Sequence, residues 1–316
     1  MWILALETSC DETSVGIIHN NQVKTNVISS QIADHLKYGG VVPELAARLH
    51  LNNLNTVLSS AFLEANISPF DLDYIAYTEK PGLIGALHIG KIAAETLGSY
   101  LDIPVIKTNH LYGHIYAGAI DHQFKFPMLA VLVSGGHTQI VYLRKHLDFE
   151  ILGTTLDDAI GECYDKVARM LGLNYPGGPV IDKLAQQGNP NTYRFPLPLD
   201  DGSYNFSFSG LKSACWNVIN KAHQNHQEIN LNDFCASFQK VCLEIIVKKT
   251  MKAIKEYHPQ MLTLVGGVSA NSALRAAFKS LARDGLEVII PKLEYCTDNG
   301  AMIARVAYQM VLNKER

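Results

Sequence analysis

Two histidines four residues apart, His110 and His114, have the spacing that points most directly to chemistry. On a helix, side chains at positions i and i+4 share one face, with Cβ atoms about 5–6 Å apart. Two imidazoles so placed can share a divalent metal, usually zinc or iron, when a third ligand completes the site. The alternative is an ordinary pair of partly exposed histidines at a helix start. The zinc-peptidase pattern HExxH needs a glutamate where this chain has Leu111, which argues against that type of hydrolysis.

A carboxylate from far along the chain is the candidate third ligand. Asp298 lies directly before the last predicted helix, residues 299–312, in the segment YCTDNGA. Because it comes from the second half of the chain, it would let one ion connect both halves. An N-cap and turn role is the simpler interpretation of an Asp-Asn-Gly segment before a helix.

Acidic residues also follow the first predicted strand, residues 2–6. Asp11 and Glu12 are candidates for general-base or electrostatic work at a reacting phosphate or acyl group. Turn and cap roles in a polar loop are the alternative for both carboxylates.

Three Gly-Gly turns, in the segments 133–138, 175–179 and 265–271, lie beside apolar runs in the second half. Such turns let a ligand approach the backbone closely and leave N–H groups free for phosphate. Together they predict a nucleotide cleft, although neither the P-loop nor the Rossmann pattern is present. Asp165, on the predicted helix 157–171, could accept from ribose hydroxyls, and Asp182 could assist; a solvated helix face is the alternative.

The elements that must position these residues occur in the same order twice. Each half is predicted to contain three strands, followed by helix, strand, helix, strand and helix, which indicates a duplicated α/β unit. We expect one lobe over residues 1–124, carrying the histidine pair, and a second over 125–316. An insertion at about 175–231 is expected in the second lobe, with a loop at 186–205 and a polar surface connection at 221–232.

Composition narrows the class of protein further. The chain has 316 residues and is 47% hydrophobic, which excludes wholesale disorder. Its net charge of −3 gives no sign of a strongly basic nucleic-acid binder but leaves room for a local basic face. No segment is predicted to cross a membrane, and no signal peptide is recognised. The six cysteines are scattered without a disulfide-like rhythm, so a cytoplasmic location is expected.

Two such lobes match the architecture of the actin, sugar-kinase and Hsp70 ATPase superfamily (ASKHA), with a central cleft. Within it, the chain resembles one family closely, the bacterial tRNA N6-adenosine threonylcarbamoyltransferases (TsaD, formerly Gcp). The resemblance is collinear from residue 4 to about 304 and rests on the segments ETSCDET, GGVVPELAARLH, KPGLIGAL, NHLYGHIYA, LVSGGHTQI, DDAIGECYDKVARMLGLNYPGGP, FSFSGLKS, GGVSANSALR and YCTDNGAMIA.

The resemblance implies transfer of a threonylcarbamoyl group from threonylcarbamoyl-adenylate to the exocyclic amine of the adenosine 3′ of the anticodon, releasing AMP. The tRNAs would be those reading ANN codons. One divalent metal per subunit is implied, Fe(II) being favoured and Zn(II) the alternative. Two partners are also implied, a non-catalytic ASKHA paralogue (TsaB-like) and a small ATPase (TsaE-like).

The same resemblance assigns the site residues. The metal ligands would be His110, His114 and Asp298, and Asp11 or Glu12 is hypothesised to accept the proton. The adenylate-side residues would be Leu132, Val133, Ser134, Gly135, Gly136, Asp165, Gly178, Asp182 and Asn271.

Three other functions compete with this one. A metallopeptidase is suggested by the histidine pair and an ATP-dependent sugar-kinase-like phosphotransferase by the fold. The third is a non-catalytic scaffold that binds nucleotide and partners. Leu111 counts against the peptidase, and no kinase acceptor signature is evident.

Overall fold

The computed structural model describes residues 1–314. The chain divides into two compact units, and the first is built from both ends of the sequence. Unit 1 comprises Met1–Gln123 and Pro291–Arg316, and unit 2 comprises Phe124–Ile290. Within residues 1–314, no helix combines the length and the apolar character needed to cross a membrane.

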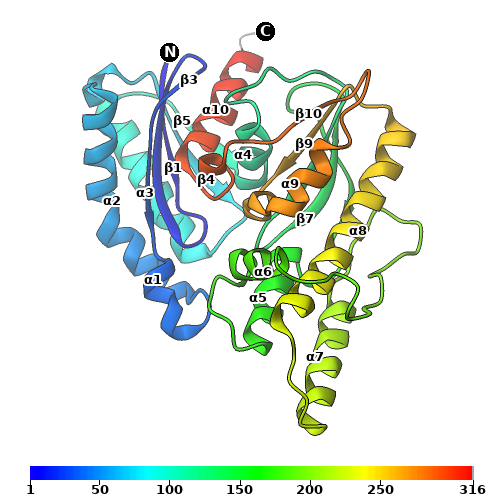
Figure 1. The fold of residues 1–316 in the computed structure, drawn as a ribbon. Coiled ribbons are helices and arrows are strands. Elements are labelled where there is room, and N and C mark those ends of the chain that lie inside the picture. The colour runs from blue at the N-terminus through cyan, green and yellow to red at the C-terminus, as the bar shows by residue number, and fades with distance from the viewer. Residues whose placement is uncertain (315–316) are drawn as a thin grey trace. The chain divides into compact units, whose positions relative to one another are not determined.

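Unit 1 contains a five-stranded mixed sheet in the order β3-β2-β1-β4-β5 (Figure 1). Strands β1, β2 and β3 form an antiparallel meander, whereas β1, β4 and β5 run parallel. The strands are Trp2–Glu7, Glu12–His19, Gln22–Ser30, Tyr74–Lys80 and Val105–Asn109. Because β1, β4 and β5 are parallel, their carboxyl ends and the turns that follow them meet at one edge of the sheet.

Helices cover both faces of this sheet, because β1 is apolar on both sides. Ile3 and Ala5 pack with helices α4 and α10, whereas Leu4 and Leu6 pack with α2 and α3. Figure 1 shows α2 and α3 on one side of the sheet and α10 on the other. The helices of unit 1 are α1 (Ile32–His35), α2 (Pro43–Ala65), α3 (Ile84–Leu101), α4 (His110–Ala117) and α10 (Gly300–Lys314).

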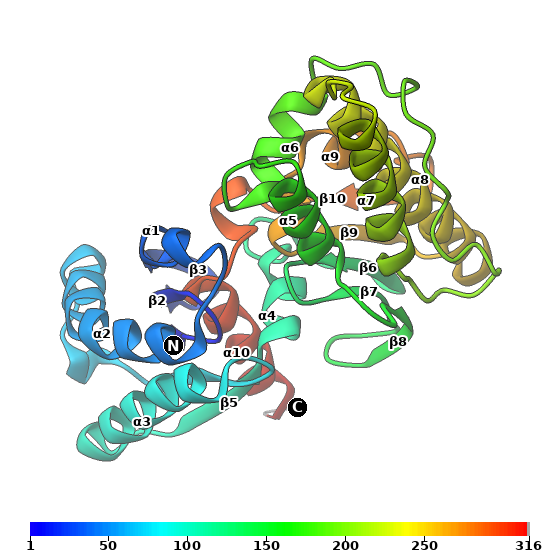
Figure 2. The ribbon, with the colours of Figure 1, turned by 90° about the horizontal axis from the view of Figure 1, so that it is seen from below.

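Unit 2 repeats the same topology. Its sheet has the order β10-β9-β6-β7-β8, with β6, β7 and β8 antiparallel and β6, β9 and β10 parallel. The strands are Met128–Val133, Thr138–Leu143, Phe149–Thr154, Met261–Val265 and Glu287–Ile289. Its helices are α5 (Ile160–Met170), α6 (Gly177–Ala185), α7 (Ser209–Gln224), α8 (Leu231–Tyr257) and α9 (Ser272–Lys279), which Figure 2 shows grouped around this sheet.

The last helix corrects the expected division of the chain. Sequence order places residues 291–316 in the second lobe, but the structure assigns them to unit 1. Helix α10 packs against β1, β2 and α4, and its first amide donates to Ser14 Oγ at 2.8 Å. Gly300 and Gly16 allow this contact, since a Cβ on either residue would overlap the other segment's backbone.

Replacing Gly300 by alanine tests this packing. The added methyl group forces α10 away from β2, and overpacking of this kind costs about 1–3 kcal/mol. We expect the free energy of unfolding, measured in urea, to fall by that amount. The control is Gly210→Ala, where a new Cβ meets no atom within 4 Å; its stability should be equal or slightly higher. Equal stability of the Gly300 variant and wild type would contradict the close approach.

Helix α7 lies in the insertion and was not expected there. Leu211, Cys215 and Ile219 are buried at a spacing of four residues and join the core of unit 2. That spacing is a helical signal, but the polar residues between these positions conceal it.

Candidate functional site

The candidate site of unit 1 lies where the parallel strands of its sheet end. Asn109 ends β5 and caps helix α4, its Oδ1 accepting from the amides of Leu111 and Tyr112 at 2.8 and 3.4 Å. This cap starts the helix at His110, so that His110 and His114 come from consecutive turns beside the edge of the sheet.

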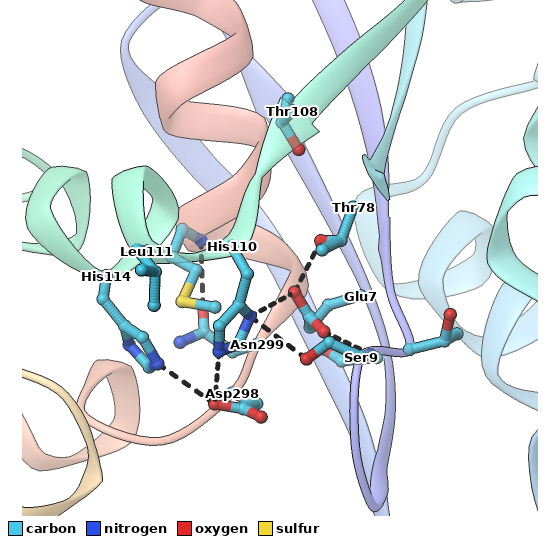
Figure 3. Close-up of polar contacts among 12 residues, drawn as sticks. Glu7, Ser9, Thr78, Thr108, His110, Leu111, His114, Asp298 and Asn299 are labelled. Atoms are coloured by element: carbon cyan, nitrogen blue, oxygen red, sulfur yellow. Dashed lines mark hydrogen bonds and ion pairs between the residues drawn. The ribbon is translucent and has the colours of Figure 1, made fainter. Parts of the chain in front are cut away.

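The structure brings the three predicted metal ligands together (Figure 3). Oδ1 of Asp298 lies 3.5 Å from Nε2 of His110 and 3.1 Å from Nε2 of His114. One ligand atom from each residue lies within 4.8 Å of the other two, and both imidazoles are buried. All three ligands belong to unit 1, which corrects the expectation that the ion would connect two lobes. Asp298 lies just before helix α10, which packs on the first sheet.

Asp298 is not the N-cap of α10, which was its alternative role. Oδ1 of the next residue, Asn299, accepts from the Met302 amide at 2.9 Å, so Asn299 performs the capping. The Asp298 carboxylate is therefore available to face the two imidazoles.

The donor set fits a divalent metal. Both ring nitrogens of His114 are buried without a hydrogen bond, and Nε2 faces Asp298 at 3.1 Å outside hydrogen-bonding geometry. Burial lowers the pKa of His114, which favours the neutral ring with a lone pair for a metal. Two imidazoles and one carboxylate are ligands of zinc and of ferrous iron, and such a set leaves coordination positions open to a reactant.

Glu7 is a residue of this site that sequence patterns did not single out. It ends β1, is fully buried, and places Oε2 3.1 Å from Nδ1 of His110. Burial would lower the pKa of His110, but Asp298 and Glu7 together raise it to about 9. Burial alone would raise the pKa of Glu7, but the charge and the hydrogen bond of His110 lower it, so that the pKa of Glu7 lies below its usual value. A lone carboxylate ending an apolar strand is the signal that could have identified it.

Asp11 lies in the turn between β1 and β2, and Glu12 begins β2 at the same edge. Asp11 is buried, and its carbonyl accepts from the Gln31 amide at 2.9 Å. Burial raises the pKa of Glu12 well above its usual value, and the charges of Asp298 and Asp11 raise it further. Glu12 therefore lies within electrostatic range of Asp298, and Asp11 lies next to Glu12.

The buried His50 holds this turn from helix α2. Its Nε2 donates to the carbonyl of Cys10 at 2.9 Å, and its Nδ1 accepts from Thr13 Oγ1 at 2.8 Å. Burial lowers the pKa of His50, which is consistent with this neutral arrangement.

The residues expected on the adenylate side all lie in unit 2. Leu132 and Val133 are buried in β6, and Ser134, Gly135 and Gly136 form the turn after it. The Ser134 amide donates to the carbonyl of His137 at 2.8 Å. Asn271 follows the parallel neighbour β9, so it lies at the same sheet edge.

Gln239 connects two of the predicted residues and was missed by sequence reasoning. Its Nε2 donates to Asp182 Oδ1 at 3.1 Å, and its Oε1 accepts from Asn271 Nδ2 at 2.7 Å. Asp182 also accepts from the Ser272 amide at 3.0 Å. Asp165 accepts from the amide of Gly177 at 2.7 Å, next to Gly178 at the start of α6.

Asp158, just before helix α5, and Glu162, in its first turn, are paired with lysines. Asp158 contacts both Lys166 and Lys212 at 2.7 Å, and Glu162 contacts Lys166 at 2.7 Å. These lysines therefore compensate the charges of both carboxylates.

Both units have the same order of strands in their sheets, and unit 1 carries the His-His-Asp group at the edge of its sheet. The chain is therefore a duplicated α/β protein of the ASKHA fold. The crystal structure of T. kodakarensis HypF agrees in fold, with a TM-score of 0.69 at 14% identity, covering 99% of this chain and 48% of that one. At this identity the likeness concerns the fold alone.

Sequence comparisons identify the family. The family model "tRNA N6-adenosine threonylcarbamoyltransferase" matches residues 22–305. A protein of that name from Mycoplasma capricolum is 54% identical over the full length of both chains. Another from Bacillus subtilis is 51% identical over 96% of this chain and 89% of its own. The chain belongs to the tRNA N6-adenosine threonylcarbamoyltransferase family.

Membership in this family establishes the type of reaction. The protein is an acyltransferase-type enzyme that acts on tRNA and forms threonylcarbamoyladenosine, and the family is metal-dependent. The peptidase and kinase alternatives are not favoured by these relatives.

Proposed function

We propose that the enzyme transfers the threonylcarbamoyl group of threonylcarbamoyl-adenylate to the adenosine 3′ of the anticodon in tRNAs reading ANN codons. A divalent metal held by His110, His114 and Asp298 is part of this proposal. The observation that carries it is the convergence of these three side chains around His114, whose buried ring nitrogens make no hydrogen bond.

The exchange of bonds is simple for such a donor. The exocyclic amine of adenosine attacks the carbamoyl carbon, a C–N bond forms, and the bond from that carbon to the phosphate oxygen breaks. AMP leaves with the electron pair, and the amine loses a proton. Because the mixed anhydride already contains a good leaving group, the protein's main work is to position the amine and stabilise developing charge.

The metal, when bound, would supply Lewis-acid polarisation of the threonylcarbamoyl group. Fe(II) is our preferred ion and Zn(II) the alternative, since both accept two imidazoles and a carboxylate. Asp11 or Glu12 would accept the amine proton, because both carboxylates lie at the sheet edge that carries the ligands.

The adenylate would be held by unit 2. Backbone N–H groups of Gly135 and Gly136 would face the phosphate, and Asp165 the ribose hydroxyls. Asp182, Gly178 and Asn271 would complete this side, with Gln239 holding two of them in place. Leu132 and Val133 would contribute through the buried strand that presents the turn.

Three of these glycines point to a ligand rather than to a structural requirement. At Gly135, Gly136 and Gly178 an added Cβ would meet no atom within 4 Å, and none has the left-handed φ that favours glycine. Gly210, inside helix α7, has the same open space, so the expected approach of a bound molecule at the three glycines follows from their position in the turn after β6 and at the start of α6.

We therefore expect Gly136→Ala to fold normally and to bind the donor poorly. A clash of about 1–3 kcal/mol raises KM for threonylcarbamoyl-adenylate about 5- to 150-fold. Steady-state kinetics and thermal unfolding measure the two properties, and Gly210→Ala, with equally open space, is the control. An unchanged KM would exclude Gly136 from the adenylate side.

We further propose two partners, a non-catalytic TsaB-like paralogue and a small TsaE-like ATPase, and a cytoplasmic location. The net charge of −3 supports docking of tRNA on a surface completed by partners, because phosphate binding needs positive charge. All six cysteines are free, as a reducing compartment requires.

Reconstitution tests the whole proposal. Purified protein, loaded with Fe(II) or Zn(II), would be incubated with threonylcarbamoyl-adenylate and unmodified tRNA, with and without the two partners. The tRNA is then digested and its nucleosides are weighed. We expect the mass of threonylcarbamoyladenosine, and one AMP released for each nucleoside formed; modification without AMP release would overturn the choice of donor.

A further inference from the structure

Glu7 is a fully buried carboxylate at the end of an otherwise apolar strand. Burying an ionised carboxylate costs several kcal/mol unless donors compensate for the lost water. The five preceding residues of β1 are all apolar, so this strand itself offers no reason for a charge. The groups that face Glu7 must therefore explain its presence.

Donors from three directions satisfy this carboxylate, as Figure 3 shows. The Ser9 amide donates to Oε1 at 2.6 Å, and Thr78 Oγ1 donates to Oε2 at 2.6 Å. Nδ1 of His110 lies 3.1 Å from Oε2. The Ser9 hydroxyl lies at 3.1 Å from the same imidazole nitrogen.

The contact with His110 has a consequence at the other side of the ring. An ionised carboxylate only accepts hydrogen bonds, so a proton must lie on Nδ1 of His110. In the neutral imidazole, Nε2 then carries the lone pair, and Nε2 is the atom that faces Asp298 at 3.5 Å. Carboxylate–histidine–metal arrangements fix the tautomer and the ring orientation in this way.

We propose that Glu7 is the positioning residue of the metal centre: it holds His110 in the tautomer and orientation that present Nε2 to the ion. Thr78 supports Glu7 from strand β4. This inference rests on the proposed metal site, and the experiment below separates the two.

The variant Glu7→Gln changes one oxygen to an NH2 group at nearly constant volume. An amide has a single acceptor oxygen, whereas Glu7 faces donors with both of its oxygens. If the amide nitrogen faces His110, then Nδ1 must accept and the proton moves to Nε2, which blocks metal binding. If the amide nitrogen faces the Ser9 amide, two donors oppose each other.

Metal affinity is the readout, because it does not depend on turnover. Co(II) and Zn(II) would be titrated into the metal-free full-length protein in competition with a chelator, and the visible spectrum of bound Co(II) recorded. We expect Glu7→Gln to bind about 10- to 100-fold more weakly, with an altered Co(II) spectrum. The matched control is Glu64→Gln. Glu64 lies on helix α2 and also accepts a hydrogen bond from a threonine, Thr25 Oγ1, at 2.5 Å. The metal affinity of this control variant should equal that of wild type.

Two further variants separate the possible failures. His114→Ala should abolish binding; if it binds as wild type does, or if wild type binds no metal, the metal site itself is wrong. If His114→Ala fails to bind but Glu7→Gln binds with wild-type affinity and spectrum, only the role of Glu7 is overturned. If Glu7→Gln does not fold, Thr78→Val replaces it as the test, because it removes one hydrogen-bond donor to Glu7. Thr78→Val must then weaken metal binding by a few-fold, and an unchanged metal affinity in this variant overturns the proposal.

Discussion

The variant His114→Ala is expected to lose threonylcarbamoyl transfer by about 10³-fold, because polarisation by a bound ion supplies several kcal/mol of transition-state stabilisation. His114 is the fully buried ligand, and Asp298 is the charged group nearest to its ring nitrogens in the part of the chain that the structure describes. A role limited to packing would not produce a loss of this size.

Thermal unfolding with and without metal distinguishes a lost ligand from a damaged fold. For wild type, metal at 100 times its Kd should add about 2.7 kcal/mol to the free energy of unfolding. His114→Ala should show no such gain. In the metal-free state its stability should change little, because alanine leaves a cavity but also removes two buried nitrogens that lack hydrogen bonds.

Asp298→Asn and His223→Ala complete this comparison. The asparagine variant keeps the volume of Asp298 but removes its charge, and it should lose transfer and metal-dependent stabilisation together. His223 lies exposed on α7, so its replacement should leave both unchanged. Full activity in His114→Ala, with metal still raising its stability, would remove His114 from the ligand set.

The fold could largely be predicted from the sequence because its strands are short apolar runs between polar turns. Residues 2–6 were expected as the first strand, and β1 covers Trp2–Glu7. The packing partner of the last helix could not be predicted, because an amphipathic pattern reveals an apolar face and not the sheet that covers it. Gly16 and Gly300 determine that partner here, through a contact between residues 284 positions apart (300 − 16).

The candidate site shows the same limit. His110 and His114 could be found because their spacing of four is local, whereas Asp298 was assigned only through family resemblance. Glu7 was missed because its partner lies 103 residues away. Gln239 was missed for the same reason: it lies on the long helix α8 and meets Asp182 and Asn271 only after folding.

The proton acceptor is the second large effect that we predict. Glu12 is the better candidate than Asp11, because a base works best with a pKa near the operating pH and the pKa of Glu12 is raised. We expect Glu12→Gln to lower kcat about 10²- to 10⁴-fold, with KM for threonylcarbamoyl-adenylate unchanged. Single-turnover measurement of tRNA modification, with metal bound, gives the rate of the chemical step.

The pH profile separates the roles of the two acids. Burial raises the pKa of Glu12 first, and the negative charge of the neighbouring Asp11 raises it further, whereas an ion bound to Asp298 would offset the contribution of that carboxylate. As pH rises through this elevated pKa, Glu12 ionises and becomes able to accept a proton, so the wild-type rate should increase. Asp11→Asn removes one of these negative charges, which lowers the pKa of Glu12, and the rising limb should move to lower pH. Glu12→Gln should lose that limb. If the limb persists in Glu12→Gln and disappears in Asp11→Asn, the base is Asp11.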